Sequence, residues 1–222
     1  MLLRLELVLI SIFFLLSNDQ NKSRIEWFVW RQIFRNFQRH PLVSDDRTNS
    51  AIGIGNGMAR TSRETITFYR LIRKLKKKYS LNTAIDLGCG DGVAVRYFEL
   101  SGLFSVGIEF DQSLSSLAQI NNPQALIISG DITESQVVDK TIKSVKSNFA
   151  NRKKQPKLLV YAFNPIEPAL LLGSLNLFAS NSNYILLLKN PKCLPFLLLD
   201  KNYKIVKESN NGNLVVLEVG QF

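Results

Sequence analysis

Short apolar runs alternate with longer amphipathic stretches from residue 81 to the end of the chain. Seven runs have the length of strands: 83–87, 105–109, 125–129, 158–163, 184–189, 204–207 and 214–219. Helical stretches lie between the first five runs, at 93–101, 112–120, 134–147 and 168–178. This alternation predicts β–α–β units, and with them a mainly parallel sheet that is covered by helices on both faces.

The last two runs are joined differently. Residues 208–213 contain the Asn-Gly dipeptide that is typical of a tight hairpin turn. We therefore expect an α/β fold with a Rossmann-like, doubly wound, mainly parallel seven-stranded sheet that ends in a C-terminal β-hairpin.

The N-terminal part of the chain has another pattern. Residues 1–17 contain an apolar run from Leu7 to Leu16 that is interrupted only by Ser11. A membrane-spanning helix needs about 20 such residues. No small-residue cleavage site follows Leu16, as a secretory signal would require. Three interpretations stay open for this segment: a cleaved signal, an uncleaved membrane-associating segment and a helix packed on the domain.

Residues 24–40 are predicted to form an amphipathic helix with an aromatic face and an arginine-rich face. The aromatic residues recur at helical spacing: Trp27, Trp30, Phe34 and Phe37. Such a helix either lies in a membrane interface or docks on a protein core by its aromatic side. A polar, glycine-rich linker follows at 42–60. We therefore divide the chain into an N-terminal helical appendage with its linker, residues 1–50, and a second domain, residues 51–222, with any membrane-surface association placed in residues 1–40.

Composition narrows the class of protein. A chain of 222 residues, of which 45% are hydrophobic, has the material for a packed core and is not mainly disordered. One histidine and two cysteines argue against a structural zinc site and against a Ser-His-Asp or Cys-His catalytic group. The cysteines show no ligand spacing, and we expect a reducing, cytoplasmic location.

The net charge of +10 invites a nucleic acid or an anionic membrane as partner. Residues 1–80 hold 15 Lys and Arg against 6 Asp and Glu, whereas residues 81–222 hold 13 against 12. Many of these cations lie on a helix predicted from the capping box Thr61–Glu64 to about Lys78. Cations in a last turn complement the helix dipole, so part of this charge needs no partner.

Candidate chemistry begins at the end of the first predicted strand, where the sequence reads DLGCGDG from Asp86 to Gly92. Glycines at this spacing let the chain turn tightly, so that its backbone can approach a ligand. The spacing differs from the Gly-x-Gly-x-x-Gly of dinucleotide-binding folds. The segment resembles the first motif of the class I S-adenosylmethionine-dependent methyltransferases. The resemblance implies S-adenosylmethionine as cofactor and these residues as part of its site: Asp86, Gly88, Cys89, Gly90 and Gly92.

Two further strand ends carry acidic residues, Glu109 and Asp131, while Asp111 is predicted to cap the helix that follows. In the family that the sequence resembles, the carboxylate at the position of Glu109 binds both ribose hydroxyls. The acidic side chain at the position of Asp131 contacts the adenine amino group, and the next residue, here Ile132, packs on the adenine ring. Parallel strands end at one edge of a sheet, so Asp86, Glu109 and Asp131 are expected to meet in one crevice. The cations and hydroxyls of S-adenosylmethionine suit such acceptors, whereas a pyrophosphate prefers helix N-termini and cations.

The fourth predicted strand is followed by Asn164 and a proline. In the resembled superfamily this segment faces the transferred methyl group, so Asn164 is the predicted catalytic, substrate-side residue, with Tyr161 and Phe163 as walls; a plain turn is the alternative. Enzymes that methylate amino nitrogens often carry a second proline and an aromatic residue here. This chain has neither, which argues against an amino base as acceptor.

These motifs predict a methyltransferase that transfers a methyl group from S-adenosylmethionine, without a metal, to a protein, a small molecule or an RNA. The alternative is a non-catalytic scaffold with the same fold, which uses its basic N-terminal region to bind RNA or a membrane surface. A dinucleotide oxidoreductase is disfavoured by the glycine spacing.

Overall fold

The computed structural model of the chain describes residues 63–150, 155–163, 168–180, 182–208 and 213–220. The chain divides into two compact units, Met1–Leu42 and Val43–Phe222, and every described residue belongs to the second. The predicted N-terminal helices and the predicted boundary at residue 50 lie outside the described residues. In the part of the chain that is described, no helix has both the length and the hydropathy needed to cross a membrane.

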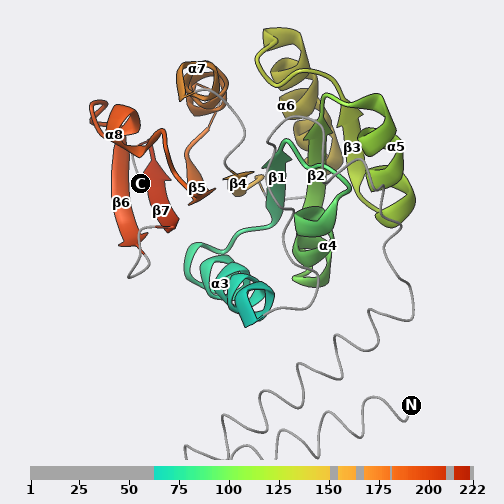
Figure 1. Cartoon of the computed structure of the whole chain (residues 1–222), viewed down its shortest axis with the longest axis horizontal. Coiled ribbons are helices and arrows are strands. Elements are labelled where there is room, and N and C mark those ends of the chain that lie inside the picture. Colours follow the sequence, from blue (N-terminus) through green and yellow to red (C-terminus); the bar gives the residue numbers. More distant parts are fainter. Residues whose placement is uncertain (1–62, 151–154, 164–167, 181, 209–212, 221–222) are drawn as a thin grey trace, which may run out of the picture. The chain divides into compact units, whose positions relative to one another are not determined.

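The described residues form one seven-stranded sheet with helices on both sides (Figure 1). The strands are β1 Thr83–Leu87, β2 Phe104–Glu109, β3 Leu126–Ser129, β4 Leu158–Phe163, β5 Tyr184–Lys189, β6 Tyr203–Glu208 and β7 Leu214–Val219. The helices are α3 Arg63–Tyr79, α4 Val93–Leu100, α5 Gln112–Asn121, α6 Ser135–Phe149, α7 Pro168–Ala179 and α8 Leu194–Leu197. All seven predicted strands are present, with bounds within one residue of the prediction.

The strand order is β3-β2-β1-β4-β5-β7-β6. The first five strands are parallel, β7 runs antiparallel to β5, and β6 pairs antiparallel with β7 alone. The predicted fold class, a doubly wound, mainly parallel sheet with a C-terminal hairpin, is therefore confirmed. The single-turn helix α8 was not predicted, because four residues are too few to show a helical period.

Local signals explain how two of the helices begin and pack. The Asp111 carboxylate accepts hydrogen bonds from the backbone N–H groups of Ser113 and Leu114, at 2.8 and 3.0 Å, which confirms the predicted cap of α5. Helix α3 buries one apolar face, and its predicted cap, Thr61, lies outside the described residues. The buried residues of that face are Phe68, Leu71, Ile72 and Leu75.

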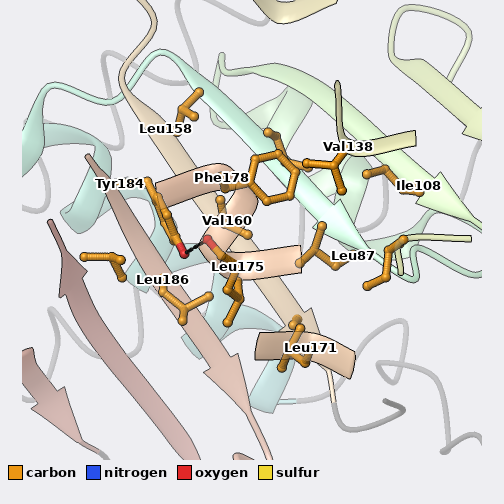
Figure 2. Packing of buried hydrophobic residues seen from close by; sticks show 14 of the residues in the cluster. Leu87, Ile108, Val138, Leu158, Val160, Leu171, Leu175, Phe178, Tyr184 and Leu186 are labelled. Carbon is orange, nitrogen blue, oxygen red and sulfur yellow. Dashed lines mark hydrogen bonds between the residues drawn. The ribbon is translucent and has the colours of Figure 1, made fainter. Parts of the chain in front are cut away.

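The main core lies between the sheet and helices α6 and α7, where every second strand residue meets helix side chains. Figure 2 shows Tyr184 of β5 against α7, with its hydroxyl donating to the Leu175 carbonyl at 3.0 Å. This bond satisfies the polar end of an otherwise buried ring. On β1, Ile85 and Leu87 belong to this core. Asp86 lies between them in sequence and therefore faces the other side of the sheet, where α4 packs.

Candidate cofactor site

The loop between β1 and α4 turns sharply at glycines and is held against the neighbouring strand. The backbone N–H groups of Gly88 and Cys89 both donate to the Ile108 carbonyl of β2, at 2.9 Å each. Gly90 and Gly92 have φ values of 55° and 84°, which are left-handed conformations that residues with a side chain rarely adopt. The glycine spacing is thus needed to form this turn at the carboxyl end of β1.

Gly90 and Gly92 have different surroundings. A Cβ atom at Gly92 would overlap the side-chain amide of Asn122, which donates to the Gly92 carbonyl at 3.1 Å. A Cβ atom at Gly90 would meet no atom within 4 Å. Gly92 therefore serves the packing of the loop against α5, and Gly90 borders open space in which a ligand could lie.

Glu109, at the end of β2, joins the ends of three neighbouring strands. Its Oε2 accepts from the backbone N–H of Gly90 at 2.7 Å, and its Oε1 accepts from that of Asp111 at 3.0 Å. Its own carbonyl accepts from the N–H of Gly130, after β3, at 2.9 Å. A carboxylate has about four acceptor positions. Glu109 is therefore fixed in place and still has capacity for two ligand hydroxyls.

Asp86 is a buried carboxyl group on β1, with 2% of its surface exposed. Burial raises its pKa well above the usual range, and the negative charges of Glu109 and Asp91 raise that pKa further. Each of these influences disfavours the charged form of the Asp86 carboxyl. A ligand that brings positive charge to this side of β1 would relieve that penalty.

The Asp86→Asn variant should be more stable than the wild type at neutral pH. Because the folded pKa of Asp86 lies above the unfolded one, the folded protein holds an extra proton between the two values. The stabilisation that comes from binding this proton is complete below the unfolded pKa, which is near 4. It is lost as the pH rises through the folded pKa. The gain in the free energy of unfolding from the substitution should therefore be larger at pH ~8 than at pH ~4.

Equilibrium urea unfolding of both proteins across this pH range measures the difference. Equal pH dependence in wild type and Asp86→Asn would show that the carboxyl is not held in its neutral form.

The other predicted cofactor residues take different positions. Asp131 is half-buried after β3, and its Oδ1 accepts from the Thr133 N–H at 2.8 Å. Ile132 is 5% exposed and belongs to the main core. The Cys89 side chain is also buried. Its sulfur packs closely against Gly107, where an added Cβ atom would lie 2.7 Å from it. Burial raises the pKa of the Cys89 thiol well above its usual range, with Asp86 and Glu109 adding to it, so this group is a neutral thiol, and the Cys89 backbone N–H and carbonyl are already bonded to Ile108 and Gly92.

The predicted substrate side is described only in part, because Asn164 lies outside the described residues. The prediction that Tyr161 is a wall of the substrate site does not fit its position. Its ring is 2% exposed and packs against Phe68 and Phe98 at centroid distances of 5.1 and 6.0 Å. The residue belongs to the core under α3 and α4 because alternation along β4 points it to that face. Phe163 is half-buried, with the Lys189 ammonium 4.9 Å from its ring centroid.

Sequence reasoning missed Phe110, which directly follows Glu109. Its side chain is 74% exposed, which is unusual for a large aromatic residue beside a buried carboxylate. A flat apolar ring at this strand end can stack on a planar heterocycle. The signal in the sequence was an aromatic residue next to the acidic end of a strand.

Two asparagines that hold the glycine loop from α5 were also missed. Asn121 donates to the Asp91 carbonyl at 2.9 Å, and the fully buried Asn122 donates to the carbonyls of Gly92 and Ala118 at 3.1 and 3.0 Å. Their positions at the end of a helix, just before a proline, gave no sign of this role.

A groove of about 970 Å³ lies elsewhere, beside α6 and the amino ends of β2 and β3, with Phe104, Gln124 and Lys143 in its wall. Ligands of open parallel sheets bind at the carboxyl ends of the strands. The groove therefore does not belong to the candidate site. Among the described residues, no group of three or more His, Cys, Asp or Glu side chains could hold a metal ion.

The strand order and the glycine loop between β1 and α4 define the class I methyltransferase fold. The candidate methyltransferase YhhF of Escherichia coli has a TM-score of 0.51 to this chain at 16% identity, and the match covers 73% of this chain and 88% of that one. The magnesium protoporphyrin IX methyltransferase ChlM of Synechocystis PCC 6803, solved with bound SAM, has a TM-score of 0.49 at 15% identity and matches over 82% and 100% of the two chains. An O-methyltransferase from Bacillus cereus, in complex with SAH, has a TM-score of 0.48 at 12% identity, and the match covers 72% of this chain and 82% of that one. No protein-family model matches the sequence, and no curated protein does.

Proposed function

We propose that the protein is an S-adenosylmethionine-dependent methyltransferase whose cofactor binds at the carboxyl ends of β1, β2 and β3. The observation that carries this proposal is the Glu109 carboxylate, which is fixed by Gly90 and Asp111 next to the open space above Gly90. The class I methyltransferase fold of the chain agrees with it.

The residues present fit this cofactor by charge. S-adenosylmethionine carries a sulfonium, an ammonium, a ribose diol and an adenine amino group, all of which favour acidic acceptors. Asp86 and Glu109 provide two such acceptors, and burial makes their attraction for a cation stronger than it would be in water. The pyrophosphate of a dinucleotide would instead bring negative charge to a place where burial and the neighbouring acidic groups already disfavour the charged form of Asp86.

Each residue then has a definable task. Glu109 would accept hydrogen bonds from the ribose hydroxyls, and Asp131 would accept one from the adenine amino group. The exposed ring of Phe110 would cover one side of the adenine, and the absence of a side chain at Gly90 leaves room for the ligand. When bound, the cofactor supplies an electrophilic methyl group together with its own leaving group.

The protein therefore needs to contribute orientation and the exclusion of water, and it needs no nucleophile of its own. A chain with one histidine can meet this requirement. Asn164 stays the predicted residue on the acceptor side, and the acceptor is proposed as a protein, a small molecule or an RNA.

Binding measurements on the purified full chain test the proposal. We expect S-adenosylmethionine and its demethylated product to bind with one-to-one stoichiometry and dissociation constants between about 1 μM and 1 mM, the range of typical enzyme substrates. Isothermal titration calorimetry gives both values, with NADH as the comparison ligand. Absence of S-adenosylmethionine binding, or tighter binding of NADH, would overturn the proposal.

Transfer of a labelled methyl group to the protein, RNA and small-molecule fractions of a source-cell extract then identifies the class of acceptor. Cofactor binding without transfer to any fraction would favour the non-catalytic scaffold.

A further inference from the structure

Helix α5 holds the glycine loop between β1 and α4 through two asparagine side chains at its C-terminal end. Asn121 Nδ2 donates to the Asp91 carbonyl at 2.9 Å, and Asn122 Nδ2 donates to the Gly92 carbonyl at 3.1 Å. Both acceptors belong to the backbone, so these contacts fix the course of the loop itself. A loop with glycine at every second position loses much conformational entropy when it becomes ordered. Contacts from outside the loop therefore favour a single conformation.

Asn122 carries an energetic penalty at this position. The residue is fully buried, and its Oδ1 is a buried acceptor without a hydrogen-bond partner in the part of the chain that the structure describes. An unpaired buried acceptor lowers the stability of a fold. An apolar side chain would avoid this penalty, but it would leave the Gly92 carbonyl without its donor. The Asn122 amide therefore serves the position of the loop more than the stability of the core.

The other end of α5 is tied to the same loop through Glu109. The Asp111 N–H donates to Glu109 Oε1 at 3.0 Å, and the Asp111 carboxylate caps the first turn of α5. Glu109 Oε2 accepts from the Gly90 N–H at 2.7 Å. The hydrogen bonds thus form a closed path from the loop to Glu109, along α5 and back to the loop. Helix α5 thereby connects the two parts of the site that are assigned to the cofactor.

We propose that Asn121 and Asn122 are positioning residues, which set the affinity of the site for S-adenosylmethionine by keeping the glycine loop closed on Glu109. The inference rests on the proposed function, because it concerns the same cofactor site. A ligand binds only those molecules in which the site is formed, so its apparent dissociation constant rises as that fraction falls. The asparagine contacts raise the fraction. They act on the ligand through the loop, since Asn122 is fully buried.

Two alanine variants of the full chain test the inference. Asn121→Ala and Asn122→Ala each remove one contact with the loop. A neutral hydrogen bond contributes roughly a fivefold factor to an equilibrium, so each variant should bind S-adenosylmethionine about fivefold more weakly than the wild type. Isothermal titration calorimetry measures the affinity under conditions in which thermal unfolding shows the variant to be folded. Asn121→Ala is the milder change, because Asn121 keeps 9% of its surface exposed.

The control, Thr141→Val, removes a buried hydrogen bond on the other face of the sheet. Thr141 of α6 is fully buried, and its hydroxyl donates to the Val137 carbonyl at 2.8 Å. This variant should lose stability but keep its affinity within a factor of about two of the wild type, because distant sites act independently. An equal loss of affinity in the control would show a general effect of destabilisation and overturn the inference.

Hydrogen exchange of the loop amides is a readout that a merely structural role would not move. In the ligand-free protein the Gly90 N–H is bonded to Glu109 and the Gly92 N–H to the Cys89 carbonyl, at 2.7 and 2.9 Å. We expect exchange at these amides to be faster in both asparagine variants and unchanged in Thr141→Val.

Two results would overturn the inference: wild-type exchange of the loop in both asparagine variants, or wild-type affinity in both folded variants. Absence of S-adenosylmethionine binding in the wild type itself would instead overturn the proposed function. The failure of the inference and the failure of the proposed function are therefore distinguishable.

Discussion

The Glu109→Ala variant should bind S-adenosylmethionine at least about 100-fold more weakly than the wild type. Each hydrogen bond between a charged acceptor and a hydroxyl contributes about 1.5–3 kcal/mol, and the proposed site uses two on this carboxylate. The Ala variant also loses the acceptor for the N–H groups of Gly90 and Asp111. Isothermal titration calorimetry measures the affinity, and thermal unfolding shows whether the variant is folded.

A second variant separates the ligand contact from the local structure. Glu109→Gln keeps the size of the side chain and one acceptor oxygen but removes the charge, so we expect a loss of about tenfold. The control is Glu208→Ala, which makes the same chemical change at an exposed carboxylate on β6. Wild-type affinity in a folded Glu109→Ala protein would show that the cofactor does not use this carboxylate.

Alanine at Gly92 should mainly lower the stability of the protein, whereas alanine at Gly90 should mainly lower its affinity for the cofactor. Both positions have left-handed backbone, so each substitution costs about 1–2 kcal/mol in strain. At Gly92 the added methyl group also displaces Asn122, with loss of its two hydrogen bonds and with overpacking against α5. We expect Gly92→Ala to lose about 3–5 kcal/mol of stability in total.

Gly90→Ala should lose the strain energy alone, because no atom lies within 4 Å of the new methyl group. That methyl group would project into the space assigned to the cofactor, so we expect at least a tenfold loss of affinity. Urea unfolding and calorimetry on both variants test the pair. Equal stability losses would contradict the packing role assigned to Gly92, and full affinity in Gly90→Ala would place the ligand away from this loop.

The sheet could be predicted from the sequence because each of its strands is a short apolar run between turn signals. The strand order carries the Asp86, Glu109 and Asp131 positions to neighbouring strand ends, as the alternation predicted. The binding role of these residues stays a prediction. Asp111 could be predicted as a cap because the hydrogen bonds it makes are local.

Other features depend on tertiary packing and could not be predicted. Tyr161 was expected at an opening and is buried, because the face that a strand residue joins depends on the helices above it. Phe110 is exposed, although phenylalanine is among the residues most often buried. Asn122 holds a loop 30 residues away in sequence, a contact that no local pattern indicates.

The order of strands in the C-terminal half has a consequence for how the protein is made. Strand β6 is synthesised before β7, yet in the finished sheet it pairs with β7 alone, and β7 lies between it and β5. Until β7 docks, β5 and β6 both lack the partner that each pairs with at this end of the sheet. Such edges pair readily with other chains. A folding intermediate in which β7 has not yet docked therefore leaves the edge of β5 open to pairing with another chain.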